Sequence, residues 1–138
     1  MSERKAECRE LEAIIGETVI GIDFFNGLRY SSLPKEVLIT MKSGKQLRLY
    51  HDQDCCETVE LVSIDGDICK LIGKPILSTE LGVDEDYDGP EISDDSGTET
   101  KITLRCDAET VIMRWIGESN GYYGEDVDFE ILQKEVAT

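Results

Sequence analysis

The sequence is short of positive charge and of long apolar segments, and each shortage excludes a class of protein. It contains 14 lysines and arginines against 30 aspartates and glutamates, which gives a formal net charge of −16. A surface of that sign repels phosphate backbones and anionic lipid headgroups, so we expect no direct nucleic-acid binding and no membrane association. No apolar stretch approaches the ~20 residues that a membrane-spanning helix needs.

The common signatures of catalysis are also missing. The chain has no Walker loop, dinucleotide fingerprint, G-x-S-x-G or H-E-x-x-H motif, and it has only 1 histidine. These absences favour a non-enzymatic protein. The excess of acidic residues suits a basic protein partner, a bound cation, or solubility alone.

The 5 cysteines do not resemble a secreted disulfide scaffold, because their number is odd and two of them are adjacent. The first residues also lack the apolar segment of a signal peptide. We therefore expect a cytoplasmic protein in which Cys55 and Cys56 are reduced and at least one of them is buried. A chain of 138 residues is expected to form a single domain over 1–138.

Hydrophobic periodicity predicts an α+β fold with a mainly antiparallel sheet. Apolar residues at helical spacing over 3–15 predict an N-terminal helix, and 67–72 fits a second short helix. Alternation with a period of two predicts a hairpin with strands near 36–42 and 45–51. Further strand-like segments begin at Ile20, Thr58, Ile76, Ile102, Val111 and Val127. The gaps near the C-terminus are too short for crossover helices, which favours antiparallel pairing.

Residues 84–99 form an acidic loop without a basic residue. Four of its carboxylates match the spacing of a calcium loop, and these are Asp84, Asp86, Asp88 and Asp95. Such a loop turns alternate side chains toward one hard cation. However, Glu91 stands where an apolar anchor is usual, and the pattern predicts no flanking helices. We keep calcium binding as an alternative and favour a solvated, mobile loop.

A second candidate site lies at residues 51–57, which gather the histidine, two thiols and three carboxylates. Its members are His51, Asp52, Gln53, Asp54, Cys55, Cys56 and Glu57. These side chains are typical ligands of zinc or iron, but a C-x-x-C pair and a second ligand pair are missing, so we expect weak or no zinc binding. Alternatively, His51 activates Cys55 as a nucleophile. We favour a strand end in which an aspartate caps a turn and the cysteines pack as small hydrophobic residues.

A third candidate is the segment 117–126, where Ser-Asn-Gly predicts a tight hairpin because Asn and Gly accept positive φ. Its candidate contact residues are Asn120, Tyr122 and Tyr123. Tyrosines combine apolar area with a hydroxyl, so they suit a recognition surface, although covering a sheet end would equally explain them. An enzyme or ligand site would need this segment, with Glu118 or Asp126, to share a cleft with His51.

Together these motifs resemble a small domain family of unknown function that is found in bacteriophages and bacteria. The family's motifs are a His-x-Gln-Asp-Cys-Cys-Glu stretch, a Gly-Asp, a Leu-x-Gly-x-Pro-Ile element, a Trp, a Ser-Asn-Gly-Tyr-Tyr hairpin and a Val-x-Phe. The matching positions are 51–57, 66–67, 71–76, 115, 119–123 and 127–129. Gly124 stands where the family pattern has Ser. The resemblance implies no activity.

The favoured function is therefore an accessory or interaction domain of phage or prophage type, with a basic protein as its partner. A subtype is an acidic inhibitor that imitates nucleic acid. One alternative is a binding domain stabilised by calcium or another cation at residues 84–99. The other is a small enzyme or ligand-binding site that uses His51 and Cys55 together with the segment 117–126.

Overall fold

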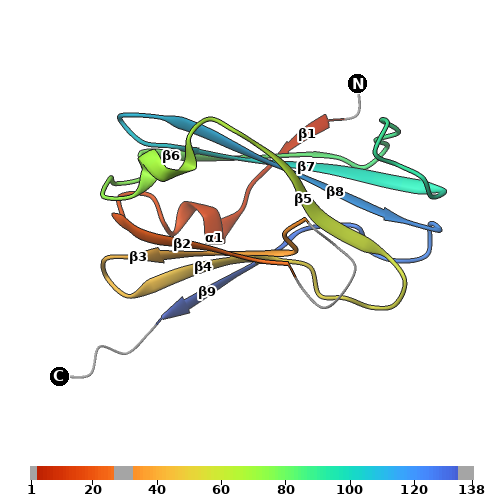
Figure 1. The fold of residues 1–138 in the computed structure, drawn as a ribbon, viewed down its shortest axis with the longest axis horizontal. Coiled ribbons are helices and arrows are strands. Elements are labelled where there is room, and N and C mark those ends of the chain that lie inside the picture. Colours follow the sequence, from red (N-terminus) through yellow and green to blue (C-terminus); the bar gives the residue numbers. More distant parts are fainter. Residues whose placement is uncertain (1–2, 27–32, 134–138) are drawn as a thin grey trace.

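In the computed structural model, which describes residues 3–26 and 33–133, two antiparallel sheets are stacked face to face (Figure 1). The strands are β1 (Glu3–Ala6), β2 (Val19–Phe25), β3 (Glu36–Met41), β4 (Lys45–Tyr50), β5 (Thr58–Asp65), β6 (Ser78–Asp84), β7 (Ser96–Arg105), β8 (Thr110–Ser119) and β9 (Asp128–Gln133). One sheet has the order β1-β6-β7-β8-β5, and the other has the order β2-β3-β4-β9. The fold is thus mainly β, and the predicted antiparallel pairing is confirmed.

The expected N-terminal helix over 3–15 is wrong for most of its length. The α-helix α1 covers only Arg9–Glu12, and β1 pairs with the side of β6 that β7 leaves open. A free sheet edge offers partners for the backbone of residues 3–6, and this pairing overrides their helical pattern. Leu11 and Ile14 still pack into the core. Near 67–72 the chain forms a single 3-10 turn, η1 (Ile68–Leu71). The described residues contain no helix long and apolar enough to cross a membrane.

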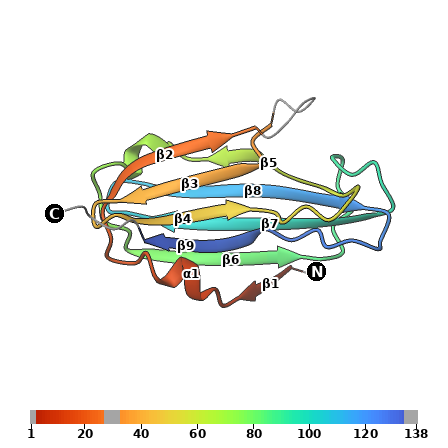
Figure 2. The same cartoon turned by 90° about the horizontal axis from the view of Figure 1, so that it is seen from below.

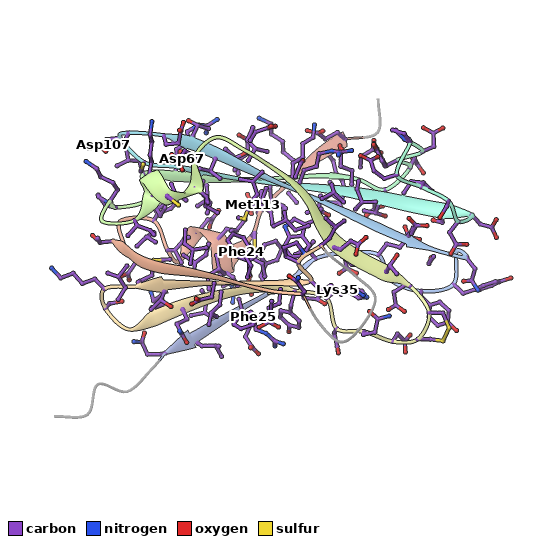
Figure 3. The ribbon with its side chains drawn as sticks, viewed as in Figure 1. Phe24, Phe25, Lys35, Asp67, Asp107 and Met113 are labelled. Carbon is purple, nitrogen blue, oxygen red and sulfur yellow. A yellow bond between two sulfur atoms is a disulfide. The ribbon has the colours of Figure 1, made fainter. Side chains whose placement is uncertain are left out.

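The predicted hairpin is confirmed as β3 and β4, which pair Val37 with Leu49 and Ile39 with Leu47. All four side chains are fully buried and face the other sheet. There they meet the inward side chains of β7 and β8. Figure 3 shows Met113 of β8 pointing into the space between the layers. Alternating burial along the strands therefore produces one shared core between the sheets.

The predicted hairpin at 117–126 is wrong, because β8 and β9 belong to different sheets. Asn120 does form a local turn, in which its side-chain oxygen accepts from the backbone N–H of Tyr122 at 3.1 Å. The chain cannot return beside β8, since β7 and β5 already pair with both edges of that strand. Instead, residues 120–127 cross from one sheet to the other, as Figure 1 shows.

This crossing segment lies directly against Gly117 of β8. A Cβ atom at Gly117 would lie 2.2 Å from the carbonyl oxygen of Glu125. We expect Gly117→Ala to lower the free energy of unfolding by roughly 1–3 kcal/mol, because the crossing segment must move outward. Chemical denaturation of the variant measures this loss.

Gly21→Ala in β2 is the matched control, because a Cβ there meets no atom within 4 Å. It should leave stability unchanged or raise it by up to about 1 kcal/mol. Equal losses in the two variants would contradict the close approach of the crossing segment to β8.

Candidate functional site

Two of the sequence candidates, 51–57 and 117–126, meet in one cleft. Strands β4 and β9 pair in register, with Tyr50 opposite Asp128, so the residue after β4 faces the residues before β9. The cleft has a volume of about 350 Å³. It is lined by His51, Asp52, Gln53, Asp54, Glu57, Gly124, Asp126 and Asp128. The pairing of β4 with β9 was not predicted, and it is what brings the two motifs together.

Glu57 forms the centre of the loop that follows β4. The residue is 2% exposed, and its carboxylate accepts from His51 Nε2 at 2.8 Å. It also accepts from the backbone N–H groups of Asp54 at 2.9 Å and Cys55 at 2.8 Å. Gln53 closes the loop by donating from its side-chain amide to the carbonyl oxygen of Glu57 at 2.6 Å. The loop is therefore wrapped around one carboxylate.

The pKa of Glu57 reflects these contacts. Burial alone would raise it, but the hydrogen bonds from His51 and from the backbone of Cys55 and Asp54 outweigh burial. They lower the pKa from 4.5 to about 2. Glu57 is thus ionised at neutral pH although it is almost wholly enclosed.

His51 uses both ring nitrogens. Nδ1 lies 2.6 Å from the carbonyl oxygen of Asp126, and Nε2 lies 2.8 Å from the Glu57 carboxylate. Both partners only accept hydrogen bonds, so both nitrogens must donate and the ring is an imidazolium. Burial would lower the pKa of His51, but the bonds to Glu57 and Asp126 raise it above the ordinary value. In this state the ring has no lone pair for a metal or for a proton.

The expectation that Cys55 and Cys56 are reduced, with one of them buried, is wrong. Their sulfur atoms form a disulfide, and both residues are exposed. Figure 3 shows this bond on the loop between β4 and β5. Because Glu57 occupies the inside of the loop, the two cysteines turn outward. As a disulfide, Cys55 offers no thiolate nucleophile, and the cysteines give no support for a reducing compartment.

The other candidate site residues of the segment 117–126 do not gather in the cleft with His51. Tyr122 is 87% exposed, and Tyr123 lines a second cavity on the other side of the segment. Glu118 is outside the cleft and accepts from the backbone and hydroxyl groups of Ser93 at 3.2 and 2.9 Å. Only Asp126, through its carbonyl oxygen, contacts His51.

The acidic loop is shorter than predicted and is tied to β8. Glu99 lies within β7, so the loop ends before Ser96. Arg114 donates to Glu91 at 2.7 Å and to the Tyr87 hydroxyl at 2.6 Å, and it also bonds Glu99. The bond from Arg114, with that from Tyr87, lowers the pKa of Glu91 to about 2. Glu91 therefore anchors the loop by charge where a calcium loop would use an apolar residue.

The four proposed calcium ligands are only partly brought together. Asp86, Asp88 and Asp95 line a hollow of about 230 Å³, whereas Asp84 uses a carboxylate oxygen to accept from the backbone N–H of Asp86 at 3.0 Å. Within residues 3–26 and 33–133, no three histidine, cysteine or acidic side chains are arranged to hold a metal ion. Calcium binding here stays an untested alternative.

Sequence reasoning missed two acidic residues that shape this region, Asp128 and Glu125. Asp128 accepts from the backbone N–H of Asp52 at 2.8 Å across the β4–β9 pair. Glu125 is 8% exposed and faces the second cavity. The available signal was that three of the four residues 125–128 are acidic, just before and at the start of the last strand. It gave no sign that one of the three is buried.

The fold and the cleft define a small, mainly antiparallel β domain with an acidic cleft built around a histidine–glutamate pair. The chain belongs to the family described as domain of unknown function (DUF7448), whose model matches residues 12–129. This match confirms the resemblance to a family of unknown function. Comparisons with curated proteins and with solved structures found no match.

The His51–Glu57 pair should make stability depend on pH. The pKa of His51 is higher in the folded chain than its ordinary 6.5, so this contribution is complete below pH 6.5 and is lost as pH rises through the folded pKa. The pKa of Glu57 is lower in the folded chain, about 2 against 4.5, so its contribution is complete above pH 4.5 and is lost toward pH 2. The pair should therefore stabilise most between these limits.

Urea unfolding from pH 4 to pH 9 measures this dependence. His51→Gln should cost roughly 3 kcal/mol near pH 6 and should remove the loss of stability above that pH, because it removes the cation facing a buried carboxylate. A wild-type midpoint that stays constant from pH 5.5 to pH 9 contradicts an imidazolium at His51.

Thiol labelling should separate the cysteines into three groups. In the native protein a maleimide should react quickly with Cys69 alone, because Cys8 and Cys106 are buried. Unfolding without a reductant should expose those two, and only a reductant should release Cys55 and Cys56. Intact mass after each step counts the labels. Five labels on unfolding without a reductant would show that the disulfide is absent.

Proposed function

We propose that this protein is a non-enzymatic interaction domain that binds a basic protein partner through the cleft between residues 51–57 and 124–128. The observation that carries the proposal is the lining of the cleft. It contains the carboxylates of Asp52, Asp54, Glu57, Asp126 and Asp128 and no lysine or arginine. One imidazolium, His51, is the only cation there. A concave surface with this lining suits an incoming ammonium or guanidinium group.

The aspartates at the rim are not neutralised within the domain. In the part of the chain that the structure describes, Asp52, Asp54 and Asp126 form no ion pair with a lysine or arginine. Other acidic side chains differ, since Glu91 and Glu99 share Arg114 and Glu36 pairs with Arg48. The rim charges therefore remain available to a partner, and their attraction should weaken as salt rises.

The fixed floor of the cleft supports binding more than catalysis. Glu57 and His51 are locked to each other, and the loop carries a disulfide in place of free thiols. The residues that the enzyme alternative required as base and nucleophile are therefore both engaged. A rigid floor under exposed aspartates lowers the entropy cost of binding a cationic side chain.

An accessory role in a phage or prophage is part of this proposal. It is supported by the motif resemblance, in which 51–57 is the longest matching stretch. The cytoplasmic location remains a prediction of the same kind.

A lysine- and arginine-rich dodecapeptide tests the proposal by fluorescence anisotropy at about 50 mM salt. The triple variant Asp52→Asn, Asp54→Asn, Asp126→Asn should weaken binding at least tenfold, because it removes the unpaired rim charges. The contact from Asp126 to His51 uses a backbone oxygen and should survive. Raising the salt to 200 mM should weaken wild-type binding.

The matched control removes the same charge from the acidic loop with Asp86→Asn, Asp88→Asn and Asp94→Asn. This variant should bind the peptide within threefold of wild type. If both triple variants lose affinity equally, net charge alone attracts the peptide and the cleft is not the binding site.

A further inference from the structure

The second cavity lies on the inner face of the five-stranded sheet, near its β1–β6 edge. Its volume is about 470 Å³. The crossing segment that runs from β8 to β9 closes it on one side, and Figure 2 shows the course of this segment. Ala6, Leu81, Val83 and Val127 give the cavity an apolar wall, and Thr98 and Glu125 are among its polar residues.

Glu125 is unusual among the buried carboxylates. Its Oε1 accepts from the Thr98 hydroxyl at 2.8 Å, and its Oε2 accepts from the Ser119 hydroxyl. Both donors are neutral. Each carboxylate oxygen can accept two hydrogen bonds, so capacity remains on the side of the cavity.

Among the residues that the structure describes, the other two buried glutamates each have a cation as a partner. Glu57 faces His51, and Glu99 is bonded to Arg114. Across the described residues Glu125 forms no ion pair with a lysine, arginine or histidine. An enclosed carboxylate without a positive partner costs free energy, which a cation entering the cavity would recover.

In the described part of the chain, the one cationic side chain that lines the cavity does not neutralise Glu125. Arg4 lines the cavity, but its guanidinium pairs with Glu85 at 2.8 Å, and its side chain is 57% exposed. This ion pair lies where the cavity wall reaches solvent. The volume of the cavity falls in the range of small-molecule sites, which is about 300–1,000 Å³.

We propose that this cavity binds a small organic cation in which a primary ammonium group is carried on a short apolar chain. The ammonium group bonds the Glu125 carboxylate, and the apolar chain lies against Leu81, Val83 and Val127. The hydroxyls of Thr98 and Ser119 hold the carboxylate in place. The inference does not depend on the acidic cleft, which has no comparable apolar wall.

Titration of the full chain with n-hexylamine at pH 7, followed by amide NMR shifts, tests the site. We expect a Kd below about 1 mM, which is reasonable for seven non-hydrogen atoms. The shifts should centre on Leu81, Val83 and Val127. The matched ligands 1-hexanol and hexanoate have the same chain without the positive charge, and both should bind at least tenfold more weakly.

Glu125→Gln keeps the shape and hydrogen-bonding groups of the side chain and removes its charge. It should weaken hexylamine binding at least tenfold and leave hexanol binding unchanged. Glu118→Gln, on β8 but outside the cavity, should bind as wild type does. If Glu125→Gln fails to fold, Ala6→Phe provides a second test, because it fills the cavity from the edge strand and should abolish binding of both ligands.

Three results would overturn the proposal. One is equal binding of hexylamine and hexanol. Another is hexylamine binding that survives both Glu125→Gln and Ala6→Phe. The third is a set of shifts confined to residues 51–54, which would place the amine in the acidic cleft instead.

Discussion

The conformation of the loop and of the crossing segment at the cleft depends on the hydrogen bonds to the buried carboxylate of Glu57. This carboxylate is enclosed by the protein and yet ionised, so every donor near it is needed to offset the loss of water. Those donors are the ring of His51 and the backbone of the residues between them. One buried charge therefore sets the path of a whole loop. Because His51 also bonds the carbonyl oxygen of Asp126, the same charge fixes the end of the crossing segment against β4.

The second constraint is topological. Both edges of β8 are paired, so the chain that leaves it must move to the other sheet, where it joins the free edge of β4 as β9. This crossing draws Glu125 inward and carries Asp126 to His51. Gly117 allows the crossing segment to lie close to β8, because any side chain there would occupy the space of the Glu125 backbone. The acidic cleft and the cavity of Glu125 therefore both result from the passage of this one segment between the sheets.

Local sequence patterns correctly predicted the structural features that are determined by residues close together in the sequence. The β3–β4 hairpin follows from alternation on either side of a short turn, and the antiparallel pairing follows from the short connections. The same reasoning failed for residues 3–6, whose partner in β6 is far away in the sequence. It also failed for the Ser-Asn-Gly turn, where the local turn is correct but the strand that follows pairs with β4. The 51–57 motif was recognisable by composition, but the burial of Glu57 and the outward turn of Cys55 depend on the folded loop.

The backbone of residues 124–126 borders a cavity on each of its two sides. Gly124 and Asp126 line the acidic cleft and also the cavity of Glu125, so a thin partition of three residues separates the two spaces. Any displacement of this partition enlarges one space at the expense of the other. Occupants of the two sides would then influence each other's affinity, and thermodynamic linkage requires the influence to be equal in both directions.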